Sequence, residues 1–154
     1  MKNLIVIFIA LWAQATLANN VANLNKSGVI LDGYDAFSYF QGDKPKKGDP
    51  KFQVKQDDAI YWFASEEDKQ AFLKDPKKFA PQFAGWCAYA VADSKEKVDV
   101  DPTSFLIQDG RLLLFYNGLW GNTREKWLHT KDKDAKIFLK DADANWPLVQ
   151  TKAP

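Results

Sequence analysis

The chain has 154 residues, of which 21 are Lys or Arg and 20 are Asp or Glu. Proteins bind nucleic acid largely through an excess of positive charge on one face, so this balance of interspersed charges argues against a nucleic-acid partner and also weakens a membrane-surface role. The single cysteine, Cys87, excludes an internal disulfide.

The first 18 residues have the pattern of a secretory signal peptide. Lys2 precedes nine consecutive apolar residues at positions 4–12, and small residues follow up to Ala18. Nine residues rise only about 14 Å as a helix, which is too short for a hydrocarbon core of roughly 30 Å. We therefore expect residues 1–18 to be removed, with cleavage after Ala18 favoured over cleavage after Ala15, and the mature protein to be periplasmic without a membrane span.

The mature part is expected to form a single domain. Residues 19–28 are polar and unpatterned, which predicts a flexible leader, and the domain itself is expected over residues 29–150. No internal repeat or interdomain linker is evident in this range. Within it, Tyr34, Phe37 and Phe40 are spaced three apart, which suits one face of a short helix.

Two hairpins are predicted from local patterns. Residues 51–55 alternate polar and apolar side chains, and an apolar stretch resumes at 60–64 after a polar turn. Residues 105–108 and 111–116 flank Asp109-Gly110, and both of these turn residues tolerate a positive φ. Together the hairpins supply a four-stranded antiparallel sheet, and with short covering helices this predicts an α+β fold.

Several short helices are predicted from their end signals. Ser65 with Asp68 starts a helix that ends near Lys74, and Asp75-Pro76 starts a second helix through Phe79. The uncharged stretch at 85–92 is either a core helix or a strand, because periodicity does not decide so short a run.

Two further helices are expected in the last third of the chain. Residues 117–121 form a turn, and Thr123 is placed to cap a helix that carries Trp127 and Leu128. A final helix has one apolar face and stops at Pro147; its face is made by Ala135, Phe138, Leu139, Ala142 and Trp146.

Residues for catalysis or metal binding are scarce. His129 is the only histidine, and its place near a predicted helix end favours a surface role. Zinc sites usually need four Cys or His ligands, and the cluster Asp99-Val100-Asp101 lacks the calcium-loop spacing. The chain has neither a phosphate-binding glycine loop nor a nucleophile-elbow serine motif. We therefore predict no catalytic residue, no metal ligand and no cofactor.

The aromatic residues provide the remaining signal. Cys87 lies between Trp86 and Tyr89 in the uncharged stretch, and these three residues are the predicted ligand-binding or partner-binding site. Most other aromatic side chains are expected in the core, and a surplus at one edge would form an apolar pocket or a partner surface.

Five stretches resemble exported YHS-domain proteins: residues 33–40 (GYDAFSYF), 61–65 (YWFAS), 72–81 (FLKDPKKFAP), 85–91 (GWCAYAV) and 142–147 (ADANWP). Shorter modules of this kind are associated with metal handling and carry Cys where this chain has Ala64. The resemblance therefore brings over Trp86, Cys87 and Tyr89, but neither a metal ligand nor a catalytic role.

The leading hypothesis is a non-enzymatic periplasmic binding or accessory module, in which residues 85–91 lie beside a small apolar cleft. Its partner would be an unidentified small ligand or periplasmic protein. One alternative is copper binding or delivery through Cys87, completed by His129 or by a thiol of another chain, because copper(I) accepts thiolate at low coordination number. Another alternative is a thiol enzyme that uses Cys87.

Overall fold

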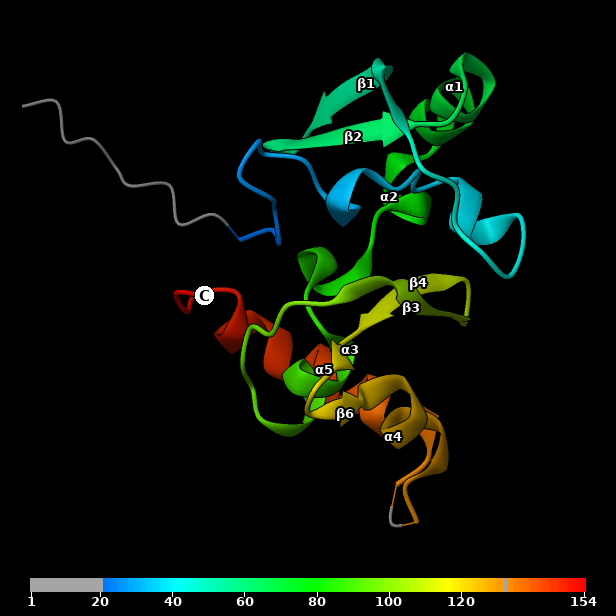
Figure 1. Cartoon of the computed structure of the whole chain (residues 1–154). Coiled ribbons are helices and arrows are strands. Elements are labelled where there is room, and N and C mark those ends of the chain that lie inside the picture. Colours follow the sequence, from blue (N-terminus) through cyan, green and yellow to red (C-terminus); the bar gives the residue numbers. More distant parts are fainter. Residues whose placement is uncertain (1–20, 132) are drawn as a thin grey trace, which may run out of the picture.

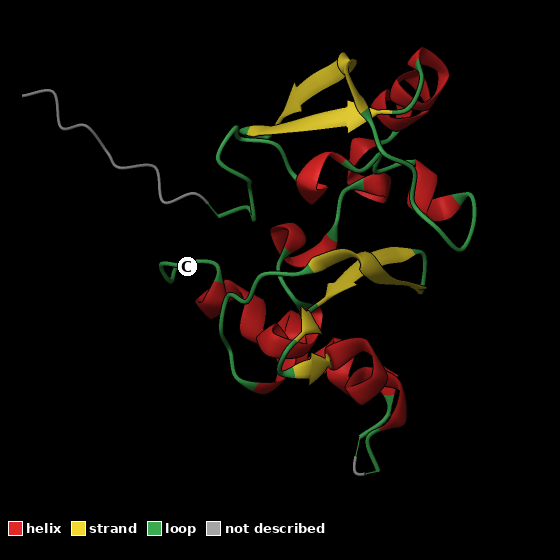
Figure 2. Ribbon diagram, viewed as in Figure 1, coloured by secondary structure: helices red, strands yellow, loops and turns green. Residues whose placement is uncertain are grey.

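The computed structural model describes residues 21–131 and 133–154. The predicted signal peptide and the first two residues of the predicted leader lie outside this range. Helices and antiparallel strands are both present, as expected for an α+β fold (Figures 1 and 2). Among the described residues, no helix has the length and apolar character needed to cross a bilayer.

The first half of the domain is built on the hairpin of β1 (Asp49–Gln56) and β2 (Ala59–Phe63). Before it lie two short 3₁₀ helices, η1 (Leu31–Gly33) and η2 (Ser38–Phe40), and after it come α1 (Glu66–Lys74) and α2 (Pro76–Phe79). The capping predictions are confirmed, because the Ser65 hydroxyl accepts a hydrogen bond from Asp68 N and the Asp75 carboxylate accepts one from Lys78 N.

The second half contains a second hairpin and the remaining helices. In chain order its elements are η3 (Gln82–Gly85), α3 (Ala88–Asp93), β3 (Asp101–Gln108), β4 (Arg111–Phe115), β5 (Asn117–Gly118), β6 (Gly121–Asn122), α4 (Thr123–His129) and α5 (Ala135–Val149). The uncharged stretch at 85–92, left open between helix and strand, therefore contains the end of η3 and most of α3.

The two large hairpins share one geometry. Each pairs an eight-residue strand that begins Asp-Pro with a five-residue strand, and each has a register shift just after that proline. Both turns hold two residues at positive φ, Asp57-Asp58 in the first hairpin and Asp109-Gly110 in the second. Such turns match the right-handed twist of the flanking strands.

The prediction that the two hairpins join in one four-stranded sheet is wrong. Each hairpin forms its own two-stranded sheet, and β5 and β6 form a third. The strand edges that might have joined are occupied by short bridges from irregular segments: Val29 pairs with Ile60, while Pro81 and Cys87 pair with Leu112 and Leu114. The hairpins are thus joined by intervening chain and by side-chain packing.

Strand β4 lies between two hydrophobic cores. Leu112 and Leu114 belong to the core around the first hairpin, whereas Leu113 and Phe115 belong to the core formed with the later helices. All four side chains are at most 1% exposed. Alternate side chains of a strand point to opposite faces, so β4 contributes to both cores at once.

The described part of the predicted flexible leader, residues 21–28, is held against the domain, which corrects that expectation. Asn23 N donates to Ala84 O at 2.9 Å, and the Trp86 indole N–H donates to Val21 O at 2.7 Å. Asn25 closes a local turn by accepting from Ser27 N and Val29 N. The backbone and polar side chains of this segment form hydrogen bonds with the rest of the fold and within a local turn.

Three helix boundaries also differ from the prediction. Asn122, not Thr123, caps α4 by accepting from Arg124 N and Glu125 N. Pro147 lies inside α5, which continues to Val149 although proline has no N–H to donate to the preceding turn. The aromatic stretch that begins at Tyr34 forms only the single turn η2.

Candidate functional site

The three predicted site residues contact three different parts of the molecule. Trp86 is 5% exposed and its indole binds the chain at Val21, whereas the Tyr89 ring packs on Phe138 of α5 with centroids 5.3 Å apart. Cys87 is fully buried and pairs with β4 at Leu114. They do not line a common pocket among the cavities found in the described residues.

Cys87 has a structural environment. Its Sγ accepts a hydrogen bond from Tyr116 N at 3.4 Å and lies 3.4 Å from the Thr123 hydroxyl. Reactive thiols need accessibility and a positive charge or helix N-terminus beside them. The buried thiol of Cys87 instead joins the residues on either side of the β5–β6 hairpin.

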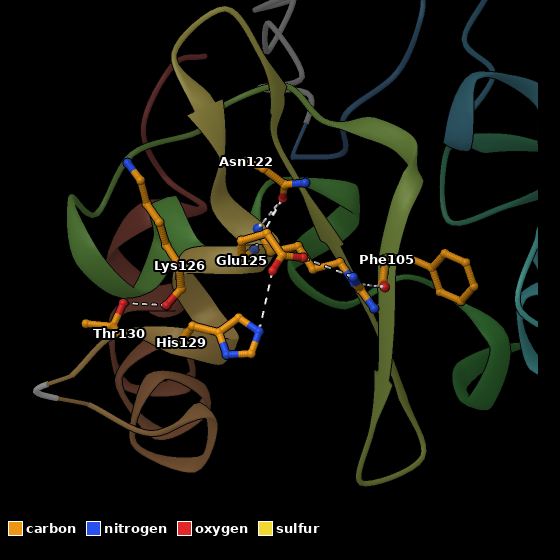
Figure 3. Close-up of polar contacts among 7 residues, drawn as sticks. Phe105, Asn122, Glu125, Lys126, His129 and Thr130 are labelled. Carbon is orange, nitrogen blue, oxygen red and sulfur yellow. Dashed lines mark hydrogen bonds and ion pairs between the residues drawn. The ribbon is translucent and has the colours of Figure 1, made fainter.

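His129 and Cys87 are not brought together. His129 is the last residue of α4 and its side chain is 71% exposed, with Nε2 3.4 Å from a carboxylate oxygen of Glu125 (Figure 3). Thr123, which contacts the cysteine sulfur, is the first residue of the same helix, so roughly 9 Å of helical rise separates the two ends. Within residues 21–131 and 133–154, no group of three or more His, Cys, Asp or Glu side chains is placed to hold a metal ion.

A cleft of about 640 Å³ lies beside the first hairpin. We call it the Tyr61 cleft; it is lined by Val21, Ala22, Ile30, Lys55, Gln56, Asp57, Asp58, Ala59, Tyr61, Ala80, Pro81 and Ala84. Four separate segments form its walls, and the hydrogen bond from Trp86 holds Val21 in place. The uncharged stretch predicted as the binding region therefore positions the Val21 wall of the cleft through Trp86.

Tyr61 is the most buried polar side chain that lines this cleft. Its side chain is 6% exposed, and its ring packs on Phe72 with centroids 4.8 Å apart. No hydrogen bond joins its hydroxyl to another described residue, yet the oxygen is not among the fully buried unsatisfied atoms and so keeps contact with solvent. A tyrosine oxygen in this position is available to a ligand.

The rim of the Tyr61 cleft is acidic. Lys55 pairs with Asp58 at 3.6 Å, which leaves the Asp57 carboxylate without an ion-pair partner among the described residues. Burial raises the pKa of Tyr61 to about 12, and the negative charge of Asp57 adds to that effect. The Tyr61 hydroxyl is therefore protonated at neutral pH, and the negative charge of Asp57 acts on a ligand in the cleft.

A second cavity of about 490 Å³ lies between β3 and the start of α4. Three of its polar side chains are engaged in the fold: Asn122 caps α4 (Figure 3), Asn117 binds Asp101, and the Arg124 guanidinium donates to Phe105 O at 2.9 Å. The Ser104 hydroxyl oxygen lacks a partner but has no solvent contact. This cavity offers a ligand fewer available polar groups than the Tyr61 cleft.

Sequence reasoning placed Tyr61 in the hairpin without assigning it to a site. Small residues at 80 and 84 and the two adjacent aspartates at 57–58 are the only local signals, and neither indicates that the segments meet.

Comparison with known proteins adds no relative. No protein-family model matches the chain, and no curated protein and no solved structure matches it either. The geometry of the Tyr61 cleft therefore carries the functional proposal.

Proposed function

We propose that this protein is a non-enzymatic binding module of the periplasm, of the exported YHS-domain type, and that it holds a small cationic molecule with an apolar body in the Tyr61 cleft. The observation that carries this proposal is the Tyr61 hydroxyl, which is set in a buried side chain and lacks a partner among the described residues. Because this oxygen faces the solvent in the cleft, a ligand can hydrogen-bond to it without breaking a bond inside the protein.

The dimensions of the cleft suit a small ligand. Its volume of about 640 Å³ falls within the roughly 300–1,000 Å³ typical of small-molecule sites. Val21, Ala22, Ile30 and Pro81 supply an apolar lining, and apolar contact contributes roughly 25 cal/mol for each Å² removed from water. Affinity would come mainly from this contact.

The charge of the ligand follows from the rim. An ammonium group placed at Tyr61 would donate to the hydroxyl oxygen and be attracted by the Asp57 carboxylate, whereas a carboxylate would be repelled. Because the pKa of Tyr61 is about 12, its hydroxyl acts as a hydrogen-bonding group and not as a base near pH 7. This supports binding over catalysis.

Three probes of similar size test the proposal: phenethylamine, 2-phenylethanol and 3-phenylpropionate. Calorimetric titration of the purified protein should rank them in that order, with the anionic probe not bound. The variant Tyr61→Phe should weaken phenethylamine about 3–10-fold, the effect of one hydrogen bond. Tyr89→Phe makes the same chemical change outside the cleft and should leave the affinity unchanged.

A second pair of variants tests the charge. Asp57→Asn should reduce the preference for phenethylamine over 2-phenylethanol, while Asp109→Asn, at the equivalent turn of the other hairpin, should not. Equal binding of all three probes, or phenethylamine affinity that is unaffected by Tyr61→Phe, would refute the proposed site.

A further inference from the structure

Two large apolar side chains stand out from the surface at one turn. Leu119 is 98% exposed and Trp120 is 85% exposed, whereas the next most exposed large apolar side chain, Leu148, is 57% exposed. Both lie at the apex of the β5–β6 hairpin, and we call residues 119–120 the Trp120 turn.

The Trp120 turn is held in a fixed shape. The Tyr116 hydroxyl accepts a hydrogen bond from Trp120 N at 3.3 Å, and its ring lies so close to Gly118 that a Cβ there would come within 2.6 Å of the hydroxyl oxygen. Thr123 donates to Tyr116 O from both its amide and its hydroxyl, each at 2.9 Å. A fixed turn presents its apolar side chains without losing much conformational freedom on binding.

The buried cysteine belongs to this support. Cys87 Sγ accepts from Tyr116 N and contacts the Thr123 hydroxyl, so the sulfur ties both ends of the hairpin to the core. The uncharged stretch selected from the sequence thus supports the Trp120 turn through the contacts of Cys87.

The part of the chain around this turn is basic. Residues 111–154 contain eight basic and five acidic residues, a formal charge of +3, whereas residues 21–110 contain 12 basic and 15 acidic residues, a formal charge of −3. Lys126, Lys136 and Lys140 form no ion pair with another described residue. Strand β6 and helices α4 and α5 lie together at the end of the molecule opposite β1 and β2 (Figure 1). The overall neutrality therefore conceals an asymmetric distribution of charge.

We propose that the Trp120 turn docks the protein reversibly on a bilayer that contains anionic phospholipids. Tryptophan and leucine on a convex turn suit the boundary between headgroups and acyl chains, where Trp is enriched. Lys126, Lys136 and Lys140 are attracted by anionic headgroups. Two apolar side chains and a few lysines give weak binding, so the charge is required as well as the turn.

Vesicle co-sedimentation tests this proposal with the purified protein. Vesicles of phosphatidylcholine and phosphatidylglycerol in equal parts should bind the protein at low salt, phosphatidylcholine vesicles should bind it at least 5-fold more weakly, and 0.5 M NaCl should release it. Trp120→Ser should reduce binding to the mixed vesicles at least 5-fold. Leu73→Ser, which removes an exposed apolar side chain of α1, should have no such effect.

Two outcomes would overturn the proposal. One is the absence of binding to the mixed vesicles, and the other is unchanged binding by the Trp120→Ser variant. If Trp120→Ser instead converts a dimer into a monomer, the turn is a self-association surface and membrane docking is refuted. The variant Tyr61→Phe should bind vesicles normally, so the proposed small-molecule site and the membrane surface can fail separately.

Discussion

The buried Asp35 carboxylate provides a direct test of what stabilises the first half of the domain. One oxygen accepts hydrogen bonds from Phe37 N at 2.8 Å and Ser38 N at 3.2 Å, and the other accepts from Ala64 N at 2.9 Å. The side chain is fully buried. It therefore joins the segment before β1 to the end of β2.

The magnitude follows from these three donors. The variant Asp35→Ala leaves three backbone N–H groups without an acceptor in the native state. At about 1 kcal/mol for each partly buried donor, the free energy of unfolding should fall by about 3 kcal/mol. Asp35→Asn keeps one acceptor oxygen but loses the other, so it should cost about 1–2 kcal/mol.

The pH dependence of stability has a defined sign. The pKa of Asp35 is raised from 3.8 to about 6, mainly by burial and also by the nearby Asp68 carboxyl, while the backbone N–H donors act in the opposite direction. The folded protein therefore holds this proton more tightly than the unfolded chain does. The resulting stability is complete below about pH 4 and is lost as the pH rises through about 6.

Urea unfolding between pH 4 and pH 7 measures both effects. Asp35→Asn should remove the loss of stability between pH 4 and 6 that the parent protein shows, while Asp99→Asn, at an exposed position, should keep it. An Asp35→Asn variant with the parent pH dependence, or an Asp35→Ala variant destabilised by less than 1 kcal/mol, would refute this reasoning.

Three further predictions concern packing and the thiol. Gly33 has φ +77°, and a Cβ there would lie 2.7 Å from the Trp62 ring, so Gly33→Ala should cost about 2–4 kcal/mol in urea unfolding. Gly42→Ala meets no atom within 4 Å and should change stability by less than about 0.5 kcal/mol; equal costs would contradict the argument. Iodoacetamide should label the fully buried Cys87 only after unfolding, and rapid labelling of the native protein would favour a thiol enzyme. Anaerobic titration followed by elemental analysis should find well below one copper ion per chain, because the sulfur is enclosed; one ion per chain would favour copper delivery.

Local features of the fold were predictable from the sequence because their causes are local. The Asp109-Gly110 turn, the Ser65 cap and the Asp75-Pro76 helix start each depend on neighbouring residues, and all three are confirmed. The separation of the two hairpins was not predictable, since the bridges at Ile60 and Leu114 depend on where distant segments pack. The similarity of the hairpins is visible in the sequence only as two Asp-Pro pairs at corresponding positions.

The candidate sites depend on such distant contacts throughout. Val21 and Tyr61 meet in the cleft because hydrogen bonds made by the Trp86 indole and by Asn23 N hold the N-terminal segment. Trp120 and Trp127 both look like core residues in the sequence. In the structure Trp127 is buried, whereas Trp120 lies on an exposed turn. Cys87 was selected for its aromatic neighbours, whereas its contacts are with Tyr116 and Thr123.

The position of β4 has a consequence for how the molecule unfolds. The alternate side chains of β4 complete both hydrophobic cores. If either core unfolds, β4 is released and part of the other core is exposed. Hydrogen exchange should then show the amides of Leu112 and Leu113 opening with the same free energy, and damage in one half should be transmitted to the other as a shared melting transition.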